Sequence, residues 1–309
     1  MSTDPDRSVR PNPGAAPAAP AAPTGVAGAT STLIISEGAG SVDRETRARL
    51  ERAFDGWRIV AFDPTADLPM LVGEGSRVAV AGGDGTIHFV IRALAGTGAT
   101  LGVLGLGTYN NFARALRLPE DVEESIDVAL NGRPAPVTIG RVNGHAFVEA
   151  AMLGLFGEAI ALGETVKERA FGEVGEELKL ILEGSAFNYH VSGDVTRQGK
   201  AMSLVVANTP TTGAHLPLGE KVPDEPALEL LPTVGATRLD LLGRLMMAAV
   251  GAGDSMAEPG LRFRSIRVET DPVVEIYADG EHAGRTPAEF TAEVGAVAVM
   301  VPWSRSASG

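Results

Sequence analysis

Hydrophobic and polar positions alternate with two different periods in the first half of the chain. Short apolar runs such as Leu33-Ile-Ile35 and Arg77-Val-Ala-Val-Ala81 are separated by amphipathic stretches with helical spacing. The apolar runs predict strands at 33–35, 57–62, 77–81 and 101–104, and the amphipathic stretches predict helices at 42–54, after 81 through 95, at 110–118 and at 121–131. Strands that alternate with helices are typical of a parallel sheet, whose ligands bind beyond the carboxyl ends of the strands.

The pattern changes after Pro134. Strands of an antiparallel or mixed sheet are predicted at 137–142, 146–153, 188–194, 202–207, 261–268, 273–278 and 297–301, with helices at 158–182 and 239–250. We therefore predict an α/β domain over 31–134 and a β-rich domain over 135–303, and we leave open whether the final strand returns to the first domain. The Pro/Ala-rich segment 1–30 is expected to be a disordered tail, and 304–309 a short second tail.

Composition narrows the classes of function. The chain has 309 residues and a net charge of −13, which argues against nucleic acid as the main partner. It contains no cysteine, which excludes disulfides, thiolate nucleophiles and cysteine-bound zinc. Neither a long apolar run nor a secretory leader pattern is present. We therefore expect a cytoplasmic protein, with peripheral contact at the inner membrane surface left open.

The turn after the third predicted strand reads Gly82-Gly-Asp-Gly-Thr86. Its glycines let the backbone approach a ligand closely, and the amides at the start of the next helix favour an anion. Asp84 would repel a phosphate unless a divalent cation lay between them, and Mg²⁺ is commonly held by carboxylates together with substrate phosphates. The turn therefore predicts a nucleotide–Mg²⁺ site. The alternative is that Asp84 only caps the helix.

A second turn repeats this arrangement after the fourth predicted strand. It reads Leu104-Gly-Leu-Gly-Thr-Tyr-Asn-Asn-Phe-Ala-Arg114, and we expect Asn110 or Asn111 to cap the following helix. Two such turns after neighbouring strands would form facing halves of one phosphate site. A dinucleotide fingerprint is disfavoured, because Asn110 stands where its third glycine belongs and no acidic residue ends a suitable later strand.

Near the C-terminus, Asp279-Gly-Glu281 lies between two strand-like runs. An Asp-Gly pair in that setting is typical of a hairpin turn, so the local pattern makes Asp279 a turn residue. The five histidines show no metal-ligand spacing such as HxxxH, and no Gly-x-Ser-x-Gly nucleophile elbow occurs.

Taken together, three motifs resemble a known family. Gly82-Gly-Asp-Gly-Thr86, Gly107-Thr-Tyr-Asn-Asn-Phe-Ala-Arg114 and Asp279-Gly-Glu281 resemble the diacylglycerol/sphingosine lipid kinases, specifically their bacterial YegS/DgkB-like branch. The resemblance runs from about residue 32 to residue 302. The first motif is shared with NAD kinases and phosphofructokinases, whereas the second is more specific to lipid kinases. The implied fold is an α/β nucleotide-binding domain with a mostly parallel sheet, followed by a β-rich, sandwich-like lipid-binding domain.

The resemblance also implies roles for individual residues. It places a set of residues around ATP: Gly82, Gly83, Asp84, Gly85, Thr86, Thr108, Asn110 and Thr65. Asp84 would hold the metal, and a structural Mg²⁺ site would lie near Asp224. Asp279 would be the general base that accepts the proton of a lipid hydroxyl. That role makes physical sense, because phosphoryl transfer needs chiefly positioning, charge neutralisation and a group that orients the attacking oxygen.

The chain departs from the family pattern at several places. Ser36-Glu-Gly-Ala-Gly40 replaces the usual Asn-Pro-x-Ser-Gly loop, and His88-Phe89 replaces Asn-Glu. Asn110-Asn111 replaces Asn-Asp, and Asp224-Glu-Pro-Ala227 replaces Asp-Gly-Leu-Leu. These departures leave open a weak, altered or inactive kinase.

From the sequence we predict an ATP- and Mg²⁺-dependent kinase. It would transfer the γ-phosphate to the hydroxyl of a diacylglycerol-like lipid at the membrane surface. Two alternatives stay open. One is an NAD kinase-like or other small-molecule kinase that uses the same first motif. The other is a degenerate member of the family that binds a lipid or a nucleotide without turnover.

Overall fold

The computed structural model describes residues 31–36, 42–155, 186–213, 216–233 and 260–303. The predicted tails at 1–30 and 304–309 lie outside these residues, as do residues 37–40 of the altered loop. The helices predicted at 158–182 and 239–250 also lie outside them.

Four parallel strands form the sheet of the first half, in the order β2-β1-β3-β4. They are β1 (Thr32–Ile35), β2 (Arg58–Ala61), β3 (Arg77–Gly82) and β4 (Thr100–Gly105). The helices are α1 (Arg44–Ala53), α2 (Leu68–Val72), α3 (Asp84–Leu94), α4 (Asn111–Ala115) and α5 (Val122–Asn131). Every element predicted for 31–131 is confirmed, and the short α2 is an addition that the sequence pattern did not predict.

Both faces of this sheet are covered, because successive strand residues point to opposite sides. On one face Ile34 packs with the apolar residues of α2 and α3, including Ile87 and Ile91. On the other face Leu33 and Ile35 pack with α1 and α5. Asp43 and Asp121 start α1 and α5 by accepting a hydrogen bond from a backbone N–H of the first turn, at 2.7 and 3.1 Å.

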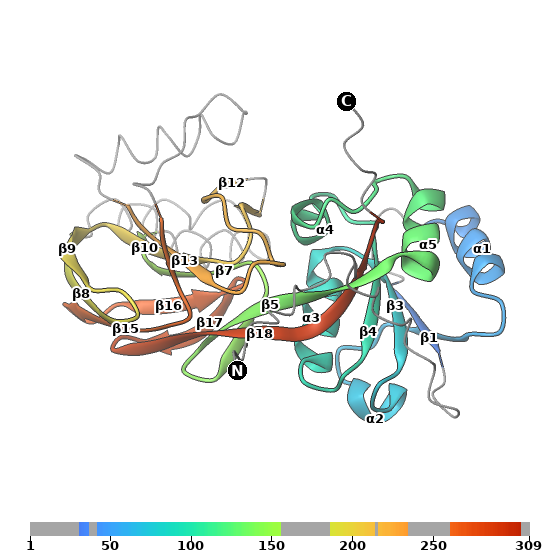
Figure 1. The fold of residues 1–309 in the computed structure, drawn as a ribbon, viewed down its shortest axis with the longest axis horizontal. Coiled ribbons are helices and arrows are strands. Elements are labelled where there is room, and N and C mark those ends of the chain that lie inside the picture. The colour runs from blue at the N-terminus through green and yellow to red at the C-terminus, as the bar shows by residue number, and fades with distance from the viewer. Residues whose placement is uncertain (1–30, 37–41, 156–185, 214–215, 234–259, 304–309) are drawn as a thin grey trace, which may run out of the picture.

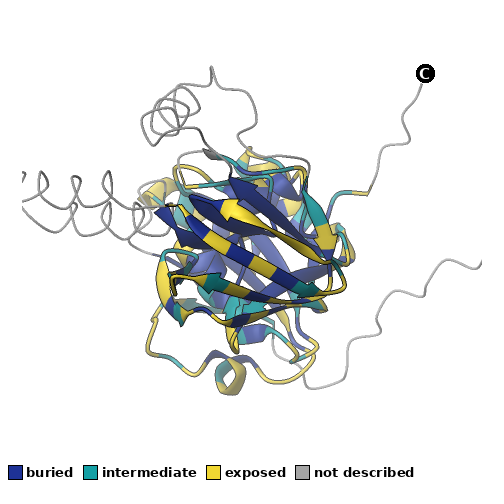
Figure 2. Cartoon of the chain, turned by 90° about the vertical axis from the view of Figure 1, so that its left-hand side faces the viewer, coloured by how far each residue is buried: buried dark blue, intermediate teal, exposed yellow. Residues whose placement is uncertain are grey.

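The second half is built almost entirely of strands. They are β5 (Arg133–Val142), β6 (His145–Phe147), β7 (Ala150–Gly154), β8 (Phe187–Gly193), β9 (Arg197–Ala201), β10 (Ser203–Ala207), β11 (Thr211–Thr212), β12 (Leu216–Pro217), β13 (Leu228–Thr233), β14 (Leu261–Phe263), β15 (Ser265–Asp271), β16 (Glu275–Ala278), β17 (Glu281–Arg285) and β18 (Ala288–Val301). One sheet has the order β14-β13-β10-β7-β16-β17. A core that includes Phe147, Phe187, Leu204 and Phe290 joins it to the other sheet, as in a sandwich. The strands of this end are banded buried and exposed in Figure 2, the alternation of a half-buried sheet.

Two long strands join the halves. β18 pairs in parallel with β4 and antiparallel with β5 and β15, so one sheet of the described residues contains strands of both halves. Figure 1 shows β5 and β18 running side by side from one half into the other. The final strand therefore does return to the first half. Near residue 134 the chain changes from alternating strands and helices to consecutive strands, but the sheet itself continues across this boundary.

Two predicted strands are each divided between the two sheets. The run at 261–268 forms β14 and β15. The run at 146–153 forms β6 and β7, which belong to different sheets. Where β6 gives way to β7, three successive backbone N–H groups donate to the carboxylate of Asp279. They belong to Val148, Glu149 and Ala150. The apolar pattern could not reveal this interruption, because the acceptor lies far away in the chain.

No helix of the described residues is long and apolar enough to cross a membrane.

Candidate active site

The two glycine turns meet at the carboxyl ends of β3 and β4. Gly82 and Gly105 are paired at the ends of these neighbouring strands. A Cβ atom at Gly107 would lie only 2.6 Å from the Cα of Gly83, so this backbone contact requires glycine. The backbone N–H of Asn110 donates to Asp84 Oδ2 at 2.8 Å, which fastens the second turn to the first. The prediction that the turns face each other is confirmed.

Asn110 closes the second turn and does not cap the helix with its side chain. It occupies the position before α4, with a left-handed φ of 52° and no capping hydrogen bond from its side chain. Its Oδ1 accepts from the Gly107 N–H at 2.8 Å, and its Nδ2 donates to the carbonyls of Gly105 and Gly107. The predicted cap is therefore wrong for Asn110, because its side chain forms its hydrogen bonds within the turn instead. Asn111, which is buried, donates instead to the Gly213 carbonyl of the β-rich half.

α3 places two polar side chains of the candidate site on one face. Gly83 precedes the helix, and Asp84 stands in its first turn. His88 follows four residues later, the spacing that brings side chains to the same side of a helix. One oxygen of Asp84 is held by Asn110, while its Oδ1 is buried and has no hydrogen-bond partner among the described residues.

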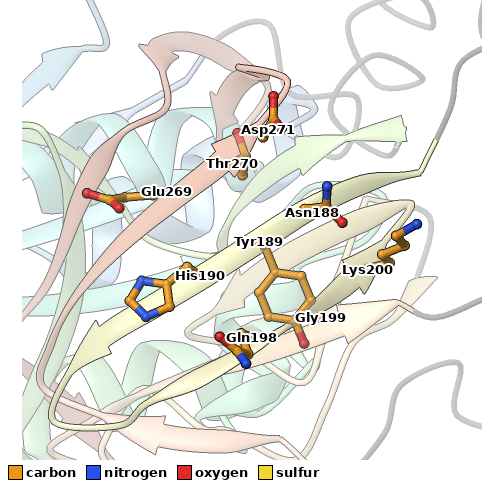
Figure 3. A pocket seen from close by; sticks show the side chains of 9 residues that line it. All are labelled: Asn188, Tyr189, His190, Gln198, Gly199, Lys200, Glu269, Thr270 and Asp271. Atoms are coloured by element: carbon orange, nitrogen blue, oxygen red, sulfur yellow. The ribbon is translucent and has the colours of Figure 1, made fainter.

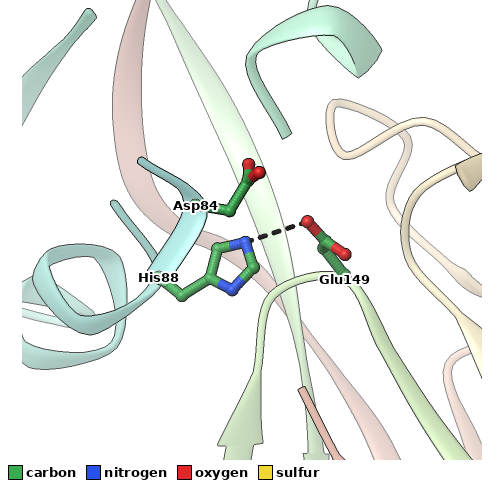
Figure 4. A group of neighbouring side chains, drawn as sticks. All are labelled: Asp84, His88 and Glu149. Carbon is green, nitrogen blue, oxygen red and sulfur yellow. Dashed lines mark ion pairs between the residues drawn. The ribbon is translucent and has the colours of Figure 1, made fainter. Parts of the chain in front are cut away.

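Glu149 approaches this face from the connection between β6 and β7, as Figure 4 shows. Its Oε1 lies 3.1 Å from His88 Nε2, and the two side chains are only 5% and 9% exposed. The pair lies within ion-pair distance, but the two atoms are not aligned as a hydrogen bond and have no other partner among the described residues. The second oxygen of Glu149 accepts from the Thr212 hydroxyl at 2.6 Å.

Asp279 lies in a two-residue hairpin turn between β16 and β17. Both turn residues have positive φ, 47° at Asp279 and 86° at Gly280, as an Asp-Gly hairpin of type I′ requires. The carboxylate points inward, where it accepts from the N–H groups of Val148, Glu149 and Ala150 at 2.7, 2.9 and 3.2 Å. Its Oδ2 lies 3.9 Å from His88 Nδ1. The predicted hairpin is confirmed, and the turn residue is also a buried acid beside α3.

The electrostatics of the site reflect three acids around one imidazole. Burial raises the pKa of Asp84, and the neighbouring Glu149 raises it further. Burial also raises the pKa of Asp279, against the opposing effects of His88 and the backbone N–H groups. For His88, burial lowers the pKa, but the carboxylates of Asp279 and Glu149 outweigh it and raise the pKa to about 8.

The other residues named from the sequence lie in varied settings. Gly85 and Thr108 are exposed next to the turns, and Thr86 is buried. The Thr65 hydroxyl donates to Asp63 at 2.6 Å within its own turn. Asp224 is exposed and borders a hollow together with residues such as Arg117, Arg133 and Trp303, and it is not part of the ligand-type cluster. The nucleotide and metal roles of these residues stay predictions.

Sequence reasoning missed His88 and Glu149 as site residues. A signal for His88 was present, because Asp84-x-x-x-His88 has the four-residue spacing that joins two side chains on one helix face. The HxxxH pattern covers two histidines, so it does not detect a pair made of a carboxylate and an imidazole. Nothing in the local sequence marks Glu149, because only the fold brings it to α3.

A hollow of about 680 Å³ lies elsewhere, on the strands β8, β9 and β15 (Figure 3). Its lining includes Tyr189, His190, Lys200 and Glu269, and none of its residues comes from β3, β4 or α3. This hollow is thus separate from the glycine turns.

Comparison with known proteins finds similarity to diacylglycerol kinases. Residues 63–142 match the family model of the diacylglycerol kinase catalytic domain, a segment that contains both glycine turns and His88. The diacylglycerol kinase of Bacillus subtilis (strain 168) is 29% identical over 247 residues, which cover 74% of this chain and 78% of that protein. That of Staphylococcus saprophyticus is 27% identical over 232 residues, covering 68% and 72%. The chain is thus similar to bacterial diacylglycerol kinases over most of its length, and its segment 63–142 matches their catalytic-domain model.

Solved structures share the fold of this chain. A diacylglycerol kinase structure from Bacillus anthracis has a TM-score of 0.65 at 19% identity and covers 88% of this chain and 97% of that one. An NAD kinase from Archaeoglobus fulgidus, solved in complex with ATP, has a TM-score of 0.50 at 13% identity, covering 89% and 94%. The predicted architecture is therefore confirmed, and the similarity to diacylglycerol kinases supports a lipid kinase.

Proposed function

We propose that this lipid kinase transfers the γ-phosphate of ATP to the hydroxyl of a diacylglycerol-like lipid. The observation that carries the proposal is the position of Asp279. This buried carboxylate lies 3.9 Å from His88 Nδ1 of α3, the helix that starts where the two glycine turns meet. Phosphorylation of a hydroxyl requires a carboxylate that orients the hydroxyl and, opposite it, a turn that binds the phosphates.

The glycine turns support the nucleotide half of the proposal. The amides at the start of α3 are free of a helix partner, and Gly85 is exposed with open space where a Cβ would stand. The triphosphate would lie along these amides, with Thr108 on the facing turn. Thr65 would contact the nucleotide from the turn after β2.

Mg²⁺ fits the same place, because Asp84 Oδ1 is a buried carboxylate oxygen that lacks a partner among the described residues. Asp84 would hold the ion with the phosphates, and the ion would supply charge neutralisation when bound. Asp224, which is exposed, would hold a separate structural Mg²⁺, as the family resemblance implies.

Asp279 would act as the general base. Its Oδ1 accepts two backbone hydrogen bonds and its Oδ2 accepts one, so one lone pair of Oδ2 stays available for a substrate hydroxyl. Burial raises the pKa of this carboxyl, which makes it a better proton acceptor than an exposed aspartate. The β-rich half would hold the lipid so that its hydroxyl reaches this oxygen.

A transfer assay tests the proposal. The full chain is incubated with γ-labelled ATP, Mg²⁺ and mixed micelles that each carry one acceptor: diacylglycerol, monoacylglycerol, phosphatidylglycerol or a sphingoid base. The proposal expects label in lipid, with diacylglycerol preferred. In parallel reactions with NAD or a sugar in place of the lipid, label in that acceptor would support a small-molecule kinase instead. Binding of ATP or lipid without any transfer would identify a degenerate family member.

Two aspartate variants separate catalysis from folding. Asp279→Asn should lower kcat by about 10²- to 10⁴-fold, the usual contribution of a general base, while ATP binding persists. Asp194→Asn is the matched control, since this carboxylate also accepts backbone N–H groups, at 2.8 and 2.9 Å, but on an exposed turn. Equal kcat values for the two variants would remove Asp279 from the mechanism.

A further inference from the structure

Three side chains at the start of α3 each present one buried atom that lacks a hydrogen-bond partner among the described residues. These atoms are Asp84 Oδ1, His88 Nε2 and Glu149 Oε1. They are all of a type that binds metals, and they lie within 4.8 Å of one another. Figure 4 shows the three side chains turned toward one another, two from α3 and one from the β6–β7 connection. Buried polar atoms are rarely left without partners, so this convergence indicates a missing ligand.

The charges around these atoms are unbalanced. Asp84, Glu149 and Asp279 are three carboxylates, and among the described residues no lysine or arginine forms an ion pair with any of them. His88 can cancel at most one negative charge. A buried charge requires a partner, and a divalent cation would supply two positive charges at this point.

The distance between His88 and Glu149 suits two ligands of one ion. Ligand atoms held at about 2.1 Å from a metal are about 3.0 Å apart at a right angle and about 3.4 Å apart in a tetrahedron. His88 Nε2 and Glu149 Oε1 are 3.1 Å apart without hydrogen-bond alignment. The exposed pair His282 and Glu275 differs, because its atoms form a hydrogen bond of 2.7 Å.

Each ligand is held in place by its second polar atom. Asp84 Oδ2 accepts from the Asn110 N–H at 2.8 Å, and Glu149 Oε2 accepts from the Thr212 hydroxyl at 2.6 Å. The Nδ1 of His88 faces Asp279 Oδ2 at 3.9 Å, and metal-bound histidines commonly direct their other nitrogen to a carboxylate. Each side chain therefore leaves one atom for the central space.

We propose that Asp84, His88 and Glu149 bind one divalent transition-metal ion through Oδ1, Nε2 and Oε1. A site with one imidazole and two carboxylates favours ions such as Mn²⁺ or Zn²⁺ over Mg²⁺, which takes oxygen ligands and keeps its water. The inference shares Asp84 Oδ1 with the Mg²⁺ proposed above and replaces Mg²⁺ at that oxygen by an ion that needs neither nucleotide nor lipid.

Binding is measured on the full, tag-free chain after treatment with a chelator, in the absence of nucleotide. Free Mn²⁺ is followed by its electron paramagnetic resonance signal, and Zn²⁺ or Mg²⁺ is added as a competitor. One Mn²⁺ per chain is expected, displaced by stoichiometric Zn²⁺ and resistant to a large excess of Mg²⁺. If Mg²⁺ displaced Mn²⁺ as readily as Zn²⁺ does, the proposal that His88 supplies a nitrogen ligand would be wrong.

Variants then identify the ligands. His88→Gln and Glu149→Gln should each weaken Mn²⁺ binding by at least about 10- to 100-fold, because each removes one direct ligand. His282→Gln, which removes the imidazole of the exposed histidine–glutamate pair, should bind Mn²⁺ like the original chain. Bound Co²⁺ should give visible absorption bands that change in His88→Gln. Unchanged Mn²⁺ affinity in His88→Gln would mean that His88 serves only as the ion-pair partner of Glu149.

The folding of each variant is checked by its melting temperature in the presence of chelator, where no metal contributes. Metal should raise the melting temperature of the original chain and of His282→Gln, and not that of His88→Gln. These readouts separate the two proposals. Metal binding without lipid phosphorylation leaves the metal site standing, whereas phosphorylation with Mg²⁺ alone and no Mn²⁺ binding overturns the metal site only.

Discussion

The two sides of the candidate site are built from different parts of the peptide. On the glycine-turn side the key groups are backbone amides, and the two turns contact each other through Gly83 and Gly107 with no side chain between them. On the acidic side the key groups are side chains, and Asp279 is held by N–H groups that lie 129 to 131 residues away in the chain. A site made from backbone is encoded in a short motif, whereas a site made from side chains depends on the whole fold.

The difference is also one of cost. Apart from Asp84, the glycine turns bury little charge, because their ligand would bring the charge with it. The acidic side gathers three carboxylates and a histidine in a nearly dry space, where each unmatched group destabilises the folded chain. The acidic side is therefore the one whose alteration should change stability most.

The largest effect is expected when the acceptor of the acidic side is removed. Asp279→Ala leaves the buried N–H groups of Val148, Glu149 and Ala150 without an acceptor and should lower the free energy of unfolding by about 3–5 kcal/mol. Asp194→Ala removes an exposed acceptor, whose two donors can turn to water, and should lower the free energy of unfolding much less. Urea denaturation measures both values. Equal losses would show that burial of the Asp279 contacts contributes nothing.

A buried cation of the β-rich half provides the next test. Lys221 is fully buried and donates to the Val222 carbonyl. Burial lowers its pKa from 10.5 to about 8, although Glu225 opposes the shift. Below pH 8 the charged lysine therefore costs stability, and the cost disappears as the pH rises toward 10.5, because the unfolded chain then holds the extra proton.

Lys221→Met should accordingly stabilise the chain near neutral pH, by at most about 3 kcal/mol. The gain should shrink steadily between pH 8 and 10.5. Urea unfolding across this range measures it, with the exposed Lys200→Met as control. A gain that stays constant with pH would contradict the assigned protonation change.

The glycine-turn side is tested by a pair of alanine variants. Gly107→Ala places a Cβ against the Gly83 backbone and should lower the free energy of unfolding by about 1–3 kcal/mol. It should also raise the KM for ATP, because it separates the two turns. Gly85→Ala meets no atom within 4 Å and lies in a helix, so its stability should be equal or slightly higher. If Gly107→Ala melts like Gly85→Ala, the turns can separate without cost.

The smallest effect is expected at the charge pair that connects the two sides. Arg92 of α3 lies 2.9 Å from Glu281 of β17, and the glutamate is 70% exposed. Such exposed pairs contribute about 0.2–1 kcal/mol and weaken with salt. A double-mutant cycle with Arg92→Gln and Glu281→Gln, measured at low and high salt, should give a coupling in this range. A coupling that is insensitive to salt would contradict the assignment as a solvent-screened pair.

The alternation of strands and helices in residues 31–131 was readable from the sequence, because each element there is specified by neighbours in the chain. The glycine turns were readable for the same reason, and even the Asp279-Gly280 hairpin followed from local turn chemistry. The division of 146–153 into β6 and β7 was not readable. Apolar periodicity predicts one strand, and the interruption is caused by a carboxylate from a distant hairpin.

By itself, the sequence determined the α/β class of the first half, the β-rich character of the second and the positions of the three motifs. These features depend on short-range periodicity and on backbone conformations that only certain residues adopt. Tertiary structure alone decided that Glu149 would face His88, that Asp279 would be buried beside both, and that β18 would join the two halves. The physical reason is that burial and the distance between charges depend on the three-dimensional arrangement. The pKa of a carboxyl group is therefore set only when folding brings its neighbours together.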